Sequence, residues 1–508
     1  MSIRVHTPEG RILDVPCVQG DTLARAIWLF PGLRPPALCS GLGCCGRCRV
    51  LFLSPPPQPS EEETRVLSCE DLAGNVRLAC RHPAASGAEV RIFPSAEPSR
   101  FLLRPDAGDA LLLAVDLGTT SLHWRAFGRS GVLAAEGREL NPQMGAGSEI
   151  MSRLAVAATP QGRARLAGLA RAALDEIVRA LPGTAVECCI AANPAMTAIF
   201  LEQDLEGLSR APYRLNYAGG RSERIAGLPP IWIPPQLAPF VGGDVSAGVA
   251  FVLARMRPEY PFLLADLGTN GEFVLALGPD KSLAASVPLG PALEGIGLRY
   301  GSVAENGAAQ AFSLGSAGLR ASVIGGGRLR SVCATGYLSL VRILLQHGLL
   351  SVEGAFSREA RTPLAGRLAE RVWDAADGLR FALTEDIYFG AHDVEALLAV
   401  KAAFSLTLER LLAHAGVGSA SLRRIFVAGA LGSHVKTDDL EALGFFPSGL
   451  GARFTPLGNS SLAGAELFLR EPEWREKIAH WAQSCSAPDL ASEQDFHAGY
   501  MRHMRFAW

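Results

Sequence analysis

The chain has 508 residues, of which 48% are hydrophobic and 19% are charged, and its formal net charge is −2. This length exceeds what one hydrophobic core can organise, so it predicts two to four domains. The near-neutral charge excludes an extended polyanion-binding surface and an acidic disordered tail, so no nucleic-acid partner is expected.

The distribution of apolar and sulfur-containing residues predicts a cytoplasmic protein. No apolar run reaches the roughly 18 residues that a membrane helix needs, so no membrane partner is expected. The opening "MSIRVHTPEGRILDV" alternates as a strand does and lacks the apolar core of a signal peptide. In a reducing compartment, eleven cysteines do not form a disulfide framework. Seven of them lie in the first 80 residues, so one segment carries the sulfur chemistry.

Residues 1–95 are predicted to form a small domain of the β-grasp type, the α+β part of a multidomain chain. "IRVHTP" and "RILDVP" are strand candidates on either side of a "PEG" turn. "DTLARAIWLF" has helical apolar spacing, with Asp21 as its candidate N-cap. "RCRVLFL" and "AEVRIF" are further strand candidates. A hairpin, a helix and later strands around a glycine-rich loop favour this fold.

The stretch "CSGLGCCGRC", residues 39–48 and hereafter the cysteine loop, favours a [2Fe–2S] ferredoxin-like centre. Such a cluster needs four thiolates, with three from one tight loop. Its sulfides accept hydrogen bonds, and glycines let backbone N–H groups approach them closely. Cys39, Cys45 and Cys48 have a spacing close to the plant-type frame. Cys44 falls outside this frame and is interpreted as a packed thiol.

The metal and its fourth ligand each have an alternative. A structural zinc site normally joins two C-x2-C knuckles, and only Cys45 and Cys48 form one here. Inert buried thiols are the remaining alternative for the loop. The fourth ligand is Cys69 or Cys80. We favour Cys80, because "VRLACRH" precedes the last strand of the domain and can return to the loop.

A linker rich in Pro, Ser and Asp is predicted at 96–110, and α/β patterns with an internal repeat follow it. "LLLAVDLGTTSLHWRAF" at 111–127 and "PFLLADLGTNGEFVLAL" at 261–277 share an apolar run, an Asp-Leu-Gly-Thr turn and a second strand pattern. This repeat predicts a duplicated α/β domain.

The predicted borders follow from the repeat. We expect an ATPase-type domain at 111–470, with two lobes at about 111–258 and 259–470. Residues 471–508, from "EPEWREKIAHWAQ" onward, are predicted to form a helical C-terminal extension.

The two Asp-Leu-Gly-Thr turns carry the elements of a phosphate site. Backbone N–H groups and hydroxyls in such a turn can surround phosphate oxygens. The carboxylate of Asp116 or Asp266 can hold Mg²⁺ or position an attacking water. One such turn could be an ordinary Asx turn, but two in matching contexts can clamp one phosphate chain. A third element, "RRIFVAGALGSHV" at 423–435, is a strand ending in Gly429 and Gly432, where a nucleoside can lie against the backbone.

These three elements in this order resemble the superfamily of sugar kinases, heat-shock ATPases and actin. Together with the cysteine loop, the chain resembles the reductive activators of corrinoid proteins, a family of iron–sulfur ATPases. The resemblance covers nearly the whole chain and rests on "CSGLGCCGRC", "RLAC", "AVDLGTTS", "NPQMGAGSEIMSRL", "VGGDVSAG", "LADLGTNGE", "GPALEGIGLRYG", "VAGALGSHV" and "GNSSLAGA".

The resemblance implies a fold, a set of site residues and their cofactors. The fold is a β-grasp ferredoxin-like domain followed by a duplicated actin-like (ASKHA) ATPase domain. The implied cluster ligands are Cys39, Cys45, Cys48 and Cys80. Asp116 and Asp266 are implied for Mg²⁺ and water. The implied ATP-binding residues are Gly118, Thr119, Thr120, Gly268, Thr269, Asn270, Gly429 and Gly432. Asp244 and Glu294 match family motifs, and either could equally be an ordinary cap or turn residue.

The resemblance also implies an activity. We expect ATP-dependent reduction of a Co(II) corrinoid protein to Co(I), with an upstream low-potential electron donor. A homodimer is suggested only by analogy with the superfamily. The alternatives are a redox-sensing ATP-binding module and a small-molecule kinase.

Three departures from the family pattern point to a divergent member. Only about 15 residues separate the two predicted domains, where family members often carry a further domain. Glu149 replaces a usual Asp in "GSEIMSRL", and "CATG" at 333–336 replaces a Cys-Gly-Ser-Gly pattern.

Overall fold

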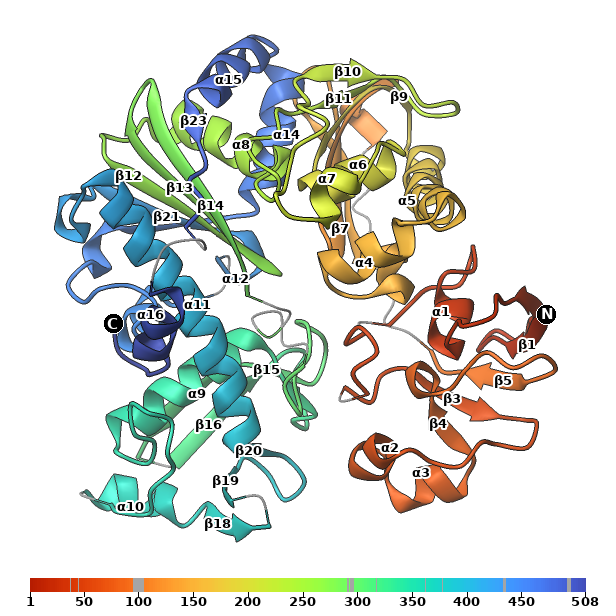
Figure 1. Cartoon of the computed structure of the whole chain (residues 1–508), viewed down its shortest axis with the longest axis vertical. Coiled ribbons are helices and arrows are strands. Elements are labelled where there is room, and N and C mark those ends of the chain that lie inside the picture. The colour runs from red at the N-terminus through yellow and green to blue at the C-terminus, as the bar shows by residue number, and fades with distance from the viewer. Residues whose placement is uncertain are drawn as a thin grey trace. The chain divides into compact units, whose positions relative to one another are not determined.

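This computed structural model describes residues 1–36, 38–43, 45–94, 105–289, 292, 297–316, 318–360, 362–376, 378–432, 435–490 and 495–508. The chain divides into two compact units (Figure 1): residues 1–244 with 465–475, and residues 245–464 with 476–508. Within the described ranges, no helix has both the length and the apolar character needed to cross a membrane. The predicted linker lies mostly outside these ranges, and so do Cys44 and Glu294.

The N-terminal part of the first unit is a five-stranded sheet, sheet A. Its strand order is β2 (Ile12–Pro16), β1 (Ser2–His6), β5 (Glu89–Ile92), β3 (Arg49–Phe52) and β4 (Val76–Leu78). Its helices are α1 (Leu23–Trp28), α2 (Glu61–Val66) and α3 (Cys69–Ala73). Figure 1 shows α2 and α3 together beside β4. All four predicted strands are present, and β1 pairs in parallel with β5.

Alternation and capping explain this part of the fold. Ile3 and Val5 of β1 are buried, and the residues between them face outward, as a half-buried strand requires. The cap of α1 is Thr22, whose side chain accepts a hydrogen bond from the N–H of Arg25. The prediction of Asp21 as the N-cap was therefore wrong by one residue. A threonine hydroxyl also fills this role, because it accepts the hydrogen bond of a first-turn N–H group.

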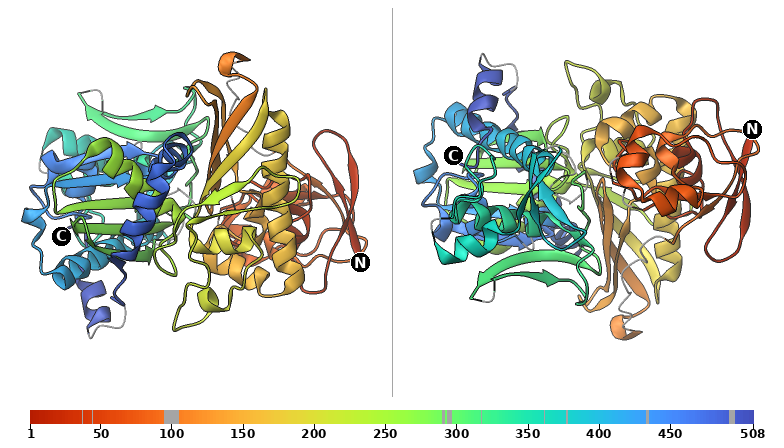
Figure 2. Two further views of the ribbon diagram at one scale, coloured as in Figure 1. Left: turned by 90° about the horizontal axis from the view of Figure 1, so that it is seen from above. Right: turned by 90° about the horizontal axis from the view of Figure 1, so that it is seen from below.

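Sheet B follows in the first unit and has six strands. Their order is β10 (Arg221–Glu223), β11 (Ile231–Ile233), β9 (Thr184–Ala191), β6 (Ala110–Leu117), β7 (Ser121–Gly128) and β8 (Leu133–Leu140). The helices are α4 (Ile150–Ala157), α5 (Pro160–Ala180), α6 (Pro194–Phe200) and α7 (Glu206–Ser209). The views in Figure 2 show α5 along one face of this sheet. Leu166 and Leu174 of α5 share one core with Leu113 of β6.

Sheet C, in the second unit, repeats the arrangement of sheet B. Its strand order is β22 (Phe454–Gly458), β21 (Arg424–Ala428), β12 (Phe262–Leu267), β13 (Asn270–Gly278), β14 (Lys281–Pro288) and β23 (Cys485–Ser486). In each sheet, three strands that follow one another in the sequence pair antiparallel: β6, β7 and β8 in sheet B, and β12, β13 and β14 in sheet C. The first of the three also pairs in parallel with a strand from further along the chain, β9 or β21. Asp116 is paired with Ala191 across β6 and β9, and Asp266 is paired with Ala428 across β12 and β21. The sequence repeat therefore corresponds to a repeated topology.

The remaining elements belong to the second unit, except that α8, α14 and α15 each have residues in both units. Two three-stranded sheets contain β16 (Gly318–Val323), β15 (Ala308–Gly315) and β17 (Ser331–Val332), and β18 (Val372–Ala375), β19 (Gly378–Ala382) and β20 (Tyr388–Gly390). The helices are α8 (Gly243–Phe251), α9 (Ala334–Gln346), α10 (Pro363–Ala369), α11 (Ala391–Ala415), α12 (Gly429–Gly432), α13 (Thr437–Ala442), α14 (Ser460–Arg470), α15 (Glu473–Gln483) and α16 (Phe496–His503). The predicted C-terminal helix corresponds to α15, and the chain after it also adds β23 to sheet C.

Two of the sequence motifs serve helix packing. A Cβ atom on Gly464 of α14 would lie 2.0 Å from the carbonyl oxygen of Ala247 in α8. A Cβ atom on Gly248 would lie 2.7 Å from Oγ of Ser460. The small residues of "VSAG" and "SSLAGA" thus let the two helix backbones approach each other closely.

We predict opposite stability effects for two glycine-to-alanine changes. Gly464→Ala should lower the free energy of unfolding by at least about 2 kcal/mol, because the methyl group overlaps a helix backbone. Gly168→Ala, in the middle of α5 with open space around it, should raise that free energy by about 0.5–1 kcal/mol. Thermal denaturation followed by circular dichroism measures both changes. An unchanged midpoint for Gly464→Ala would contradict the packing argument.

Candidate functional site

Strand pairing brings Cys48 and Cys80 together. Cys48 immediately precedes β3, and Cys80 follows β4 by two residues. The two strands are antiparallel, with Arg49 opposite Leu78. The ladder continues to the carbonyl of Cys48, which accepts a hydrogen bond from the N–H of Ala79. The two cysteines therefore lie at the same end of sheet A, although 32 positions separate them in the sequence.

All four predicted cluster ligands line one cavity of about 230 Å³. Its walls are formed by the cysteine loop, the start of α1, Cys80 and the segment that precedes α4. The lining residues are Thr22, Ala24, Arg25, Leu38, Cys39, Ser40, Gly41, Cys45, Cys48, Cys80, Met144, Gly145, Ala146 and Gly147. Cys69, the alternative fourth ligand, is exposed at the start of α3 and does not line the cavity.

Two of the thiols in this cavity, Cys48 and Cys80, have pKa values that are shifted in opposite directions. A hydrogen bond with Cys48 lowers the pKa of Cys80, and the backbone N–H of Gly43 acts in the same direction. The same thiol–thiol hydrogen bond, together with burial, raises the pKa of Cys48. Metals bind the thiolate form. The two pKa shifts are opposite in direction, so Cys80 is the more readily ionised thiol of this pair.

A buried glutamate fixes the segment that carries Cys80. Glu63 of α2 is fully buried. Its carboxylate accepts a hydrogen bond of 2.5 Å from the N–H of Leu78 and lies 2.9 Å from Nε2 of His82. The backbone N–H of Ser60 donates to the same carboxylate at 2.7 Å. Glu63 thus holds the residues two positions before and two positions after Cys80.

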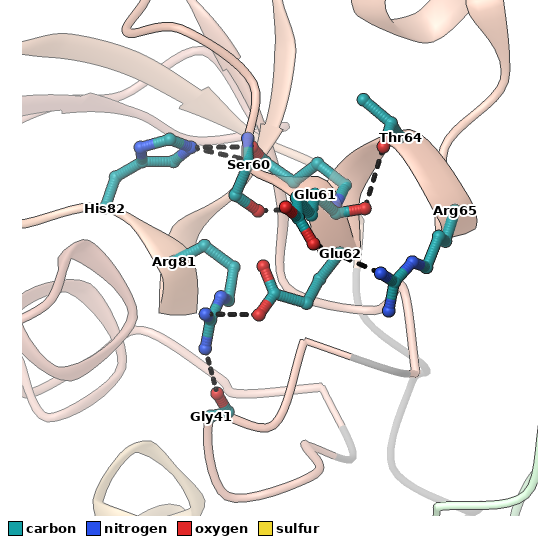
Figure 3. A network of polar contacts seen from close by, with 9 residues as sticks. Gly41, Ser60, Glu61, Glu62, Thr64, Arg65, Arg81 and His82 are labelled. Carbon is teal, nitrogen blue, oxygen red and sulfur yellow. Dashed lines mark hydrogen bonds and ion pairs between the residues drawn. The ribbon is translucent and has the colours of Figure 1, made fainter.

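Arg81 connects this segment to the cysteine loop. Figure 3 shows its guanidinium between the carbonyl of Gly41 and the carboxylate of Glu62. The two distances are 3.3 Å and 2.6 Å. Ser40, Gly41, Gly43 and Gly46 all have positive φ angles, so the loop is tightly wound. The contact from Arg81 fixes this loop from the side of Cys80.

The donor set fits an iron–sulfur cluster in number and in kind. A [2Fe–2S] cluster takes four cysteines in total and distributes them over two irons. Four thiols line this cavity. Within the described ranges, no group of three or more His, Cys, Asp or Glu side chains is arranged as a site for a single metal ion.

The first Asp-Leu-Gly-Thr turn, residues 116–120, has its carbonyl groups held from one side. Nδ2 of Asn141 donates to the carbonyl of Gly118 at 2.7 Å, and the N–H of Asn141 donates to the carbonyl of Thr120 at 2.9 Å. Nη2 of Arg153 donates to the carbonyl of Thr119. These bonds hold the turn from its carbonyl side, and the N–H of Gly118 closes it by donating to the carbonyl of Ser121 at 3.0 Å.

Residues at the carboxyl ends of β6 and β9 surround this turn. Nδ2 of Asn193 donates to Oγ1 of Thr119 at 3.0 Å. The N–H of Asp244, at the start of α8, donates to the carbonyl of Ala192 at 3.3 Å. The structure thus places Asp244 at the same sheet edge as Asp116. Ligands of open α/β sheets bind outside the carboxyl ends of their strands.

The second turn, residues 266–270, lies beside the third predicted element. Gly429 has φ +86°, and a Cβ atom there would lie 2.4 Å from Oδ1 of Asp266. Gly432 packs against the backbone of Val427, which brings α12 close to β21. Thr269 is buried, and the carbonyl of Asn270 accepts a hydrogen bond from the N–H of Gly268. The structure therefore brings these predicted residues together within the second unit.

Six residues that contact either the segments around the cysteine cavity or the first turn were not predicted from the sequence. They are Glu63, Arg81, His82, Asn141, Arg153 and Asn193. The pattern Ser60-x-x-Glu63 is a readable capping box, and the structure forms it. The long-range contacts of Glu63 leave no such signal in the sequence.

The chain matches two models of one protein family. Residues 111–256 match the RACo middle region. Residues 261–508 match the C-terminal domain of RACo, the ASKHA domain. The first match covers the residues predicted as the first lobe, and the second match begins close to the predicted start of the second lobe.

Relatives and a solved structure agree with these matches. The corrinoid activation enzyme RamQ of Eubacterium limosum is 27% identical over 417 residues, which are 78% of this chain and 70% of that protein. A Co(II) methylated amine-specific corrinoid protein reductase of Methanosarcina barkeri is 27% identical over 288 residues, 54% of this chain and 51% of that protein. A reductive activator for corrinoid, iron–sulfur protein shares the fold with a TM-score of 0.68 at 21% identity, covering 99% of this chain and 98% of that chain. The chain belongs to the RACo family, the reductive activators of corrinoid proteins.

Proposed function

We propose that this protein returns an oxidised corrinoid protein from Co(II) to Co(I) in an ATP-dependent reaction. The printed names of both relatives concern corrinoid proteins, and one names the Co(II) state. Co(I) is a strong nucleophile that accepts methyl groups, and one electron restores it from Co(II). An upstream low-potential donor supplies that electron.

The observation that carries the proposal is the gathering of Cys39, Cys45, Cys48 and Cys80 around one cavity. We assign these four residues as the ligands of a [2Fe–2S] cluster. When bound, such a cluster accepts and releases one electron at a time. Glu63 and Arg81 keep Cys80 at the loop, and the glycines of the loop let its N–H groups approach the acceptor atoms.

We assign Asp116 and Asp266 to Mg²⁺ and water, and the two turns to the phosphates of ATP. Plant-type centres have potentials near about −400 mV, which is not low enough for Co(I) without assistance. Moving one electron uphill by about 100 mV costs about 2.3 kcal/mol. A ligand that binds two conformations with affinities differing by a few kcal/mol can supply this bias. Binding or hydrolysis of ATP is the proposed source.

The domain assignment follows from these roles. Residues 1–95 are proposed as the electron-transfer domain, and residues 111–470 as the nucleotide domain. Asp244, Gly268, Thr269, Asn270, Gly429 and Gly432 are assigned to the nucleotide together with Gly118, Thr119 and Thr120.

The direct test is Co(I) formation. Anaerobically reconstituted protein, a reductant and candidate corrinoid proteins should give the Co(I) absorbance band only when ATP is present. Asp266→Ala should abolish the stimulation by ATP. ATP turnover that depends on a small-molecule substrate, with no response to any corrinoid protein, would instead establish a kinase.

We predict that the cysteines differ sharply in effect. Cys45→Ser and Cys80→Ser should lose the visible and EPR signals of a ferredoxin-type cluster and abolish Co(I) formation, since each removes one ligand. Cys69→Ser is the matched control, because Cys69 is exposed and away from the cavity, and it should keep both. Loss of the cluster signals in Cys69→Ser but not in Cys80→Ser would overturn the assignment of the fourth ligand.

We further predict that Gly429→Ala weakens nucleotide binding at least about tenfold, which corresponds to about 1.4 kcal/mol. The added methyl group would displace the carboxylate of Asp266. Gly449→Ala is the control, because Gly449 has φ +85° and no atom near its Cβ position. It shares the backbone strain without the collision. Isothermal titration with a Mg²⁺–ATP analogue measures both affinities, and equal affinities would contradict the assignment.

A further inference from the structure

The segment 141–153, hereafter the bridging segment, contacts both candidate sites of the first unit. It includes a short 3₁₀ helix at Pro142–Ala146 and the start of α4. Its first residue, Asn141, donates to the carbonyl of Gly118 in the first Asp-Leu-Gly-Thr turn. Gly145 and Gly147 line the cavity of the cysteines. One short segment therefore spans the distance between the two sites.

At one end, the bridging segment is bonded to the cysteine loop. Oγ of Ser40, the residue after Cys39, accepts a hydrogen bond of 2.8 Å from the N–H of Ser148. The hydroxyls of Ser40 and Ser148 also lie 2.8 Å apart. Ser148 is fully buried, and a Cβ atom on Gly145 would lie 2.6 Å from the carbonyl carbon of Trp28. These contacts tie the bridging segment to the cysteine loop and to the end of α1.

At the other end, Arg153 is hydrogen-bonded to the first Asp-Leu-Gly-Thr turn. Its side chain is fully buried. Nη2 donates to the carbonyl of Thr119, and Nε donates to the carbonyl of Gly147 at 3.1 Å. One planar guanidinium thus joins the turn to the residue that precedes Ser148. A buried guanidinium needs such hydrogen bonds, and its rigid geometry transmits a displacement of either partner.

We propose that Arg153 is a positioning residue that couples the nucleotide state of the Thr119 turn to the cysteine loop through Gly147, Ser148 and Ser40. This inference rests on the proposed binding of nucleotide at the turn. A phosphate chain that binds the N–H groups of the turn draws the peptide of Thr119, and Arg153 follows its carbonyl. The shift reaches Ser40, which is bonded covalently to Cys39.

Amide hydrogen exchange of the full-length reconstituted protein tests this coupling without relying on activity. The probe is the non-hydrolysable analogue AMPPNP with Mg²⁺. In the wild type, it should slow exchange severalfold in the peptide that contains Thr119 and also in the peptide that contains Cys39 and Ser40. Ser40→Ala should keep the first effect and lose the second. Arg153→Met should lose the second and weaken the first.

Two matched controls separate coupling from general damage. In Ser54→Ala, the lost hydroxyl accepts the N–H of Glu89, the first residue of β5, and this bond lies within the N-terminal part of the chain. In Arg163→Met, the lost guanidinium binds the carbonyls of Ala157 and Gln203, away from the turn. Both variants should respond to AMPPNP as the wild type does. Ser40→Ala, a mild change, keeps the test valid if Arg153→Met fails to fold.

The outcomes distinguish this inference from the proposed function. Slowing only at the Thr119 peptide in the wild type overturns the coupling and leaves nucleotide binding intact. Slowing at the Cys39 peptide that persists in Ser40→Ala and Arg153→Met also overturns the coupling alone. No slowing at either peptide in the wild type overturns nucleotide binding at the turn and the coupling with it.

Discussion

The antiparallel pairing of β3 with β4 is the constraint on which the candidate redox site depends. The cysteine loop is local in sequence, but Cys80 reaches it only because Arg49 pairs with Leu78. Glu63 reinforces that pairing, since its carboxylate binds the backbone of the same strand end. A buried carboxylate with several hydrogen-bond donors is costly to remove, because its partners lose their acceptor. The geometry of four thiols is thus maintained by a ladder of ordinary backbone hydrogen bonds.

The two larger sheets also use backbone pairing to place their functional side chains. Each has an aspartate at the end of a strand with an antiparallel neighbour on one side and a parallel neighbour on the other. The residues after the parallel neighbour differ between the two sheets. After β9 comes Asn193, which donates to the hydroxyl oxygen of Thr119 in the first turn. After β21 comes Gly429, which lies against Asp266. The two sheets therefore share a topology, but the residues that contact their Asp-Leu-Gly-Thr turns differ.

The sequence was sufficient for the parts of this molecule that are local or repeated. The strands of sheet A, the cysteine loop and the two Asp-Leu-Gly-Thr turns follow from alternation, spacing and turn chemistry. Residues that act over long distances were not predictable. Glu63 reads as one acid in a charged helix, and Arg153 reads as a surface arginine four residues after Glu149. Their burial is decided by elements that are distant in the sequence. The border between the two lobes, expected near 258, lies between the ends of the two family-model matches at 256 and 261, because the repeated strand–turn pattern marks where the second lobe begins.

The contacts between the N-terminal sheet and the rest of the first unit restrict how far this sheet can move. Met144 is fully buried in the core beneath sheet A. Arg165 of α5 donates to the carbonyl of Leu29 at the end of α1. Swinging this sheet away on its linker would expose Met144 and strip this carbonyl of its donor. These two contacts hold the N-terminal sheet against α5 and the bridging segment, so any partner that reaches the cysteine cavity has to approach it in this fixed position.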